Sequence, residues 1–147
     1  MEQANYQELL VWQKAMKLTV VIYKLVKKLP KEELYSLSDQ MDSRSTRLLI
    51  ELWWTCSNTI KRACHEVSRT VVSIPSNIAE GQDRQTKKEF IQFLNISRGS
   101  KAELETQLVI CVKVGYLKET EILEAKNLLI EIGKMLTSLI NKLKTDN

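Results

Sequence analysis

The residue types that most often carry catalysis are few in this chain, and their spacing does not bring them together. The single histidine, His65, directly follows Cys64. Neighbouring residues on a helix point about 100° apart, so this pair does not form a nucleophile–base dyad. Glu103 and Glu105 are two positions apart and do not share a helical face. The sequence therefore predicts a protein that is not an enzyme.

Motifs for metals and cofactors are also missing from the sequence. There is no Glu-x-x-His pair for a di-iron bundle site, and Gly81 stands alone rather than in a phosphate-binding loop. The three cysteines are an odd number without C-x-x-C spacing, which favours buried free thiols over disulfides or zinc. We expect no cofactor and no metal. A redox or metal-binding bundle that uses Cys56, Cys64 and His65 is the competing hypothesis.

Length and composition are those of one helical domain. The 147 residues suit a single domain, 1–147, with a core of its own. Only 4 Gly and 2 Pro occur, which favours a few long helices over a fold with many turns. No apolar run is long enough to span a bilayer, and the N-terminus lacks the features of a signal peptide, so we expect a cytoplasmic protein without a membrane partner. The net charge of +4 permits a nucleic-acid partner without demanding one.

Helices are predicted at both ends of the chain. The first spans 6–29 and stops before Pro30, because the residue before a proline disfavours the α region. Three- and four-residue steps predict that its buried face holds Leu9, Trp12, Met16, Val20, Tyr23 and Val26. The last helix carries a heptad stripe of Ile122, Ala125, Leu129, Ile132, Leu136, Leu139 and Leu143. Leu128, Met135 and Ile140 widen this stripe, which favours bundle core over a narrow seam for a partner helix.

The third helix has clear signals at its start and its end. Thr86 and Glu89 have the spacing of a capping box, and Gly115 is placed to end the helix in the left-handed conformation. The predicted buried side holds Phe90, Phe93, Leu94, Ser97, Leu104, Leu108 and Cys111. A glycine inside a helix costs about 1 kcal/mol relative to alanine. Gly99 and Ser100 therefore indicate the close approach of another helix, and we predict them at a subunit contact.

The second helix is expected to end near Glu80, with Gly81 as its stop. Pro75 either begins this helix or kinks it, since a proline removes the backbone bond to the carbonyl of Val71. The polar residues around the proline are interpreted as structural, satisfying that carbonyl, rather than as a binding site: Ser73, Ser76 and Asn77.

Several ordered stretches of the chain match the pattern of one protein family. They are residues 10–16, 29–35, 73–81, 88–94, 99–100, 103–108 and 115–117, of which SIPSNIAEG at 73–81 is the longest. In these stretches the chain resembles the bacterial four-helix-bundle family first described as proteins encoded in intervening sequences of 23S ribosomal RNA genes. That family is also called the S23 ribosomal protein family.

The resemblance implies a fold and a set of partners. It implies an all-α, antiparallel up-down-up-down four-helix bundle that assembles with itself into a ring, typically a pentamer. It also implies kinship with the accessory proteins of diversity-generating retroelements, which bind a reverse transcriptase and nucleic acid. No catalysis is attributed to the family.

The chain departs from the family pattern between residues 42 and 67, an apparent insertion of 26 residues (67 − 42 + 1). Three interpretations compete: a helical hairpin that turns at 57–59, a lengthened second helix, or foreign sequence that packs poorly. The apolar run at 48–54 must be covered by the bundle, a sister subunit or a partner. We favour an ordered helical element and predict Trp53 and Trp54 at an oligomer interface.

Basic residues gather around the third helix. Arg84, Lys87 and Lys88 flank its start, and Arg98 and Lys101 lie further along. These five residues are predicted to bind RNA or DNA by charge and shape, within a ribonucleoprotein, because a ring would repeat the patch around its axis. On a monomer, a solvated basic face is the competing interpretation. The alternative function is a protein–protein adaptor or scaffold, such as a reverse-transcriptase accessory protein.

Overall fold

The structure, a computed structural model, describes residues 5–28 and 46–145, with side chains described for 5–28 and 62–145. A 3-10 turn η1 (Tyr6–Glu8) precedes four α-helices, and the described residues contain no strand: α1 (Leu10–Val26), α2 (Thr46–Gln82), α3 (Lys87–Lys113) and α4 (Leu123–Thr145). The prediction of an all-α chain with four helices is confirmed. None of these helices, over the part described, combines the length and hydropathy of a membrane span.

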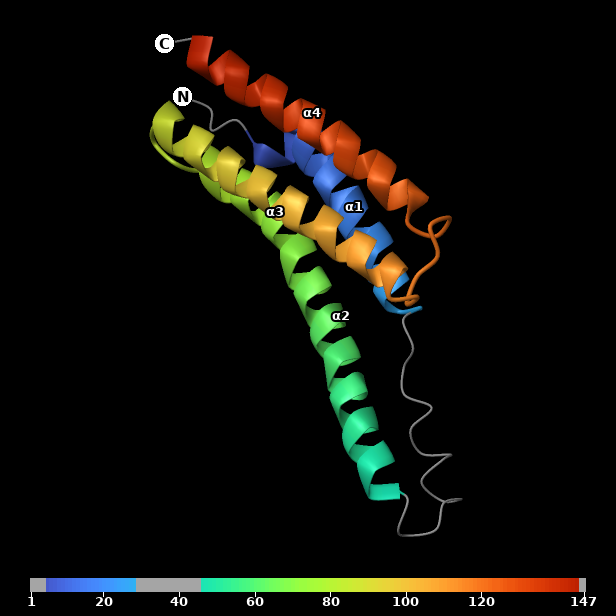
Figure 1. The fold of residues 1–147 in the computed structure, drawn as a ribbon. Coiled ribbons are helices and arrows are strands. Elements are labelled where there is room, and N and C mark those ends of the chain that lie inside the picture. The colour runs from blue at the N-terminus through green and yellow to red at the C-terminus, as the bar shows by residue number, and fades with distance from the viewer. Residues whose placement is uncertain (1–4, 29–45, 146–147) are drawn as a thin grey trace.

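Consecutive helices run antiparallel, so the bundle has the expected up-down-up-down topology (Figure 1). Each helix packs against two others, in the order α1, α2, α3, α4 and back to α1. α1 and α3 therefore lie on one diagonal of the bundle and α2 and α4 on the other. Helices on the same diagonal do not contact each other, so their outer faces lie on opposite sides of the bundle.

The core is apolar and has contributions from all four helices. α4 buries the stripe predicted from its heptads, together with Leu128 and Ile140, while Leu139 and Leu143 pack at its margin. α3 buries the predicted residues except Phe93, which is half-buried. Its C-terminus follows the prediction as well: Gly115 has φ +83°, and the Tyr116 N–H donates to the Cys111 carbonyl at 2.8 Å.

The predicted buried face of α1 is wrong at its centre. Met16, Val20 and Tyr23 are exposed on α1, and Leu9 forms an extended residue between η1 and α1 rather than part of one long helix. The residues that enter the core belong to a second stripe on the opposite side: Val11, Ala15, Leu18, Ile22 and Leu25. Both stripes have three- and four-residue spacing, so periodicity alone does not choose between them.

α2 is a single continuous helix of 37 residues, about 55 Å long at 1.5 Å per residue. Of the three interpretations of 42–67, the lengthened helix is confirmed, and a hairpin with a turn at 57–59 is wrong. Its N-terminal part runs on past the end of the bundle formed by the other helices (Figure 1). Pro75 lies inside the helix without interrupting it. Trp53 and Trp54 lie on α2 outside the residues whose side chains are described.

A polar seam joins α2 to α3 along the matched segment 73–81. The Ser97 hydroxyl donates to the Ile74 carbonyl at 2.6 Å, and the hydroxyls of Ser73 and Ser100 lie 2.9 Å apart. Asn77 Nδ2 donates to the Ser73 carbonyl at 2.7 Å rather than to Val71, which the sequence suggested. Ser73 and Asn77 therefore have a structural role, as predicted, but they bond to Ser100 and to the Ser73 carbonyl rather than to the carbonyl of Val71.

Gly81 is a point of close contact between α2 and α3. It lies inside α2, without positive φ, so the prediction that it stops the helix is wrong. A Cβ at this position would lie 2.6 Å from Phe93 Cβ and 2.9 Å from Phe90 Cδ2. Only glycine lets the two helices approach this closely.

We expect Gly81→Ala to lower the free energy of unfolding by about 1–3 kcal/mol, because the added methyl overpacks the α2–α3 contact. Gly133→Ala on α4 is the matched control: its Cβ would meet only the flexible end of Lys101 at 3.4 Å. The control should gain up to about 1 kcal/mol from helix propensity. Urea denaturation at one protein concentration measures both, and equal stability of the two variants would contradict the packing role of Gly81.

Candidate nucleic-acid interface

The turn between α2 and α3 is fixed by the cap of α3. Thr86 has an extended backbone, and its hydroxyl accepts from the Glu89 N–H at 3.2 Å. The same hydroxyl donates to Glu89 Oε2 at 2.6 Å. The predicted capping box is thus present, with the carboxylate bound to the hydroxyl. This cap holds Lys87 and Lys88 in the first turn of α3, beside Arg84 in the preceding turn.

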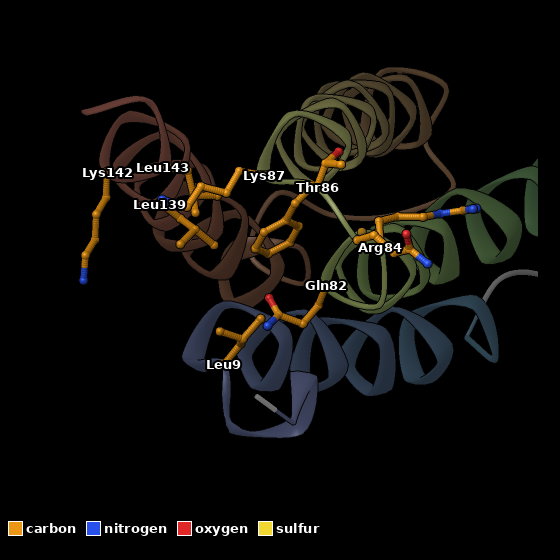
Figure 2. Close-up of a pocket in the computed structure, with 11 residues that line it drawn as sticks. Leu9, Gln82, Arg84, Thr86, Lys87, Leu139, Lys142 and Leu143 are labelled. Carbon is orange, nitrogen blue, oxygen red and sulfur yellow. The ribbon is translucent and has the colours of Figure 1, made fainter. Parts of the chain in front are cut away.

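A hollow of about 360 Å³, the bundle-end hollow, lies where α3 begins and α4 ends (Figure 2). Leucines and Phe90 supply its apolar part, and Arg84, Lys87 and Lys142 supply three cations. No aspartate or glutamate is among its lining residues: Leu9, Gly81, Gln82, Arg84, Gln85, Thr86, Lys87, Phe90, Leu139, Lys142 and Leu143. An anion bound in this hollow would meet positive charge beside an apolar surface.

Arg84 is held in place by two contacts outside the hollow. Its guanidinium forms an ion pair with the Glu80 carboxylate one turn earlier. Its Cζ also lies 4.9 Å from the centre of the Phe93 ring. These contacts orient the side chain, and Glu80 offsets part of its charge.

A second concave surface, the α3–α4 groove, runs along the flank of the bundle. Its lining residues again include cations and no carboxylate: Lys101, Ile130, Gly133, Lys134, Thr137, Ser138 and Asn141. Because Gly133 has no Cβ, the Lys101 stem lies close against α4, where a Cβ would be 3.4 Å from Lys101 Cε. Lys101 Nζ forms an ion pair with Glu105 Oε2 at 2.7 Å.

The five predicted nucleic-acid-binding residues therefore fall into separate places. Arg84 and Lys87 line the bundle-end hollow, and Lys101 lines the α3–α4 groove. Lys88 and Arg98 are exposed on α3, and neither forms an ion pair with any residue whose side chain the structure describes.

The structure places two further cations at these surfaces that were not predicted from the sequence, Lys134 and Lys142 on α4. Their signal in the sequence is that they lie off the heptad stripe of the last helix. The sequence does not show that Lys142 lies at the bundle-end hollow and Lys134 at the α3–α4 groove, because this depends on how α4 packs against the other helices.

Gly99 and Ser100, which were predicted at an oligomer interface, have different surroundings. Ser100 is half-buried and contacts Ser73 within the same chain, so it serves the α2–α3 contact. Gly99 is exposed, and nothing in the chain lies within 4 Å of a Cβ built there. The close approach predicted at Gly99 is not made within the chain, and its place in a subunit contact stays a prediction.

The cysteines and the histidine are not arranged for catalysis in the described part of the chain. Burial raises the pKa of the Cys64 thiol, and burial together with the neighbouring Cys64 raises the pKa of Cys111. A raised pKa keeps a thiol protonated and unreactive. His65 is exposed, with Nδ1 3.7 Å from the Glu66 carboxylate. The described residues contain no cluster of three metal-ligating side chains, and the side chain of Cys56 lies outside them.

The fold and these surfaces define a small antiparallel four-helix bundle with cationic hollows on one flank and at one end. A family model described as 23S rRNA-intervening sequence protein matches residues 7–49 and 55–138. The chain belongs to this family. No curated protein matches the chain.

A solved structure shares the fold. It is a protein with unknown function from the S23 ribosomal protein family of Bacteroides thetaiotaomicron VPI-5482. The two chains are 23% identical, with a TM-score of 0.63 over 89% of this chain and 98% of the other. The family match includes residues 42–49 and 55–67, so only residues 50–54 of the predicted insertion at 42–67 lie outside it, and the predicted departure from the family is wrong in its extent.

We expect Thr86→Ala to lower the free energy of unfolding by about 1 kcal/mol, because the Glu89 N–H at the start of α3 loses its acceptor. Thr86→Ser keeps the hydroxyl and should retain most of the stability. Thermal or urea denaturation compares the two variants. If the alanine variant equals the serine variant, the cap does not stabilise this turn.

Proposed function

We propose that this protein is a non-enzymatic, self-associating bundle, pentameric as family resemblance suggests, that binds RNA or DNA by charge and shape. One observation carries the nucleic-acid proposal: cations line both the bundle-end hollow and the α3–α4 groove, and neither lining includes a carboxylate. Phosphates are the anions that such surfaces select. The description of the family by an intervening sequence of 23S rRNA supports the same class of partner.

The spacing of the cations suits a nucleic-acid backbone. Lys87 and Lys101 are 14 positions apart on one helix, about 21 Å, which is the axial rise of about six base pairs. Lys134 faces the same groove from α4. No side-chain motif for reading base edges accompanies them, so binding is expected to depend little on sequence.

Fluorescence anisotropy with a labelled structured RNA and a DNA duplex, each at 50 mM and 200 mM salt, tests the proposal. We expect binding at low salt that weakens steeply at high salt, because each neutralised phosphate releases a counterion. Absence of binding at low salt to both probes would sink the nucleic-acid proposal.

Removing two groove cations should weaken binding in a defined way. The double variant Lys101→Gln and Lys134→Gln should lower the slope of log affinity against log salt by up to about 2, one for each lost phosphate contact. Lys118→Gln, in the loop at the other end of the bundle, removes a lysine outside both hollows and is the control. If the control weakens binding as much as the double variant, net charge and not the groove determines affinity.

A protein adaptor, such as a partner of a reverse transcriptase, is the second candidate. The N-terminal part of α2 that extends past the bundle and the exposed apolar residues of α1 favour it, because both offer surface to a protein partner. Affinity purification from the native host, with a reverse-transcriptase gene sought beside this gene, tests it. Recovery of no protein partner would count against this candidate.

A further inference from the structure

The bundle-end hollow has an apolar floor. Phe90 of α3 is buried in its lining, and Leu9, Leu139 and Leu143 around it are half-buried. Figure 2 shows these leucines on two sides of the hollow, Leu139 and Leu143 on α4 and Leu9 just before α1. The floor therefore keeps apolar surface partly in contact with solvent, and a ligand that covers this surface gains free energy from its burial.

The positive charge of the hollow lies at its rim. Lys87 from α3 and Lys142 from α4 both line the hollow and are exposed. Arg84 lines it as well, although its ion pair with Glu80 offsets part of its charge. No carboxylate is among the lining residues. The matching ligand has an anionic group at one end and a flat or apolar body at the other.

The paired part of a nucleic-acid duplex matches only the rim. Its bases are stacked on one another, so it presents phosphates, sugars and base edges to a protein. A duplex phosphate bound at the rim would leave the apolar floor uncovered. An unpaired nucleotide matches both parts, because its phosphate is an anion and its base has a free face that packs on aromatic and apolar side chains.

The size of the hollow also suits one such group. Its volume of about 360 Å³ is near the lower end of the range of roughly 300–1,000 Å³ found for small-ligand sites. The α3–α4 groove differs in character, because Ile130 is the one large apolar residue in its lining. The two surfaces adjoin on α4, where Asn141 lines the groove and Lys142 lines the hollow. A strand that leaves a duplex in the groove would thus reach the hollow.

We propose that the bundle-end hollow binds one unpaired nucleotide of a nucleic-acid strand, with its base on the apolar floor and its phosphate at Lys87 and Lys142. The inference rests on the nucleic-acid binding in the proposed function and names the part of the nucleic acid that this site takes. Every base has a flat face, so the site selects unpaired nucleotides without selecting a base sequence.

Three labelled probes with the same duplex separate the floor from the rim. One is blunt, one carries a short unpaired overhang, and one carries an overhang of equal length that lacks the bases but keeps the phosphates. Fluorescence anisotropy at low salt gives the affinity for each. We expect the overhang with bases to bind about fivefold or more tightly than the overhang without bases, because one base packed on the protein contributes about this factor.

The variant Leu143→Gln makes the floor polar with little change in size. It should bind the two overhang probes equally, with unchanged affinity for the probe that lacks bases. Leu123→Gln is the matched control, because Leu123 is 57% exposed at the start of α4, at the other end of the bundle, and this variant should keep the preference. Circular dichroism checks the fold. If Leu143→Gln loses helical content, Leu9→Gln tests the same floor from its other side.

The outcomes separate this inference from the proposed function. Absence of binding to all three probes would contradict both. Binding of the two overhang probes with equal affinity would overturn the inference alone, since charge would then account for binding. A preference that survives in both Leu143→Gln and Leu9→Gln would place the base elsewhere. A free mononucleotide that competes as well as the overhang, mole for mole, would show that the hollow takes a small ligand and not a strand.

Discussion

The contact between α2 and α3 at Gly81 is the constraint on which the rest of the structure depends. Phe90 and Phe93 occupy the space that any side chain at Gly81 would need, so the two helices lie unusually close at this end. The polar seam continues that contact along the bundle, with Ser97 donating to the carbonyl of Ile74 deep in the core. A donor and acceptor buried together hold one register, because sliding the helices would leave both unsatisfied.

That register determines where the surfaces of the molecule lie. With α2 fixed on α3, α1 and α4 close the bundle from the other side, and Gly133 lets Lys101 lie against α4. The cations of the α3–α4 groove and of the bundle-end hollow are brought together in this way from helices distant in the sequence. The outer faces of α1 and α3 are left free on the diagonal.

Repetition is what would make the weak surface of one chain effective. A few cations on one bundle bind phosphate weakly, and ions in solution screen them over about 10 Å at 0.1 M salt. An assembly that repeats the groove adds contacts to the same nucleic acid, and affinity then rises without any new chemistry in the single chain. Arg98 and Lys101 could be predicted from the sequence because they lie on one helix with clear boundaries. Lys134 and Lys142 could not, because their place beside other cations depends on how α4 packs against its neighbours.

The sequence by itself determined the features that depend on nearby residues. The cap at Thr86, the left-handed Gly115 and the stripe of α4 were all predicted and are all present, because cap hydrogen bonds and a 3.6-residue period are properties of a short stretch of chain. Only the tertiary structure decided which stripe of α1 is buried. Leu18 and Val20 both belong to stripes with helical spacing, and the choice between them follows from the positions of α2 and α4. The same holds for Gly81. From its neighbours in the sequence it is predicted to stop the helix, but it is a packing contact, because two phenylalanines of another helix lie against it.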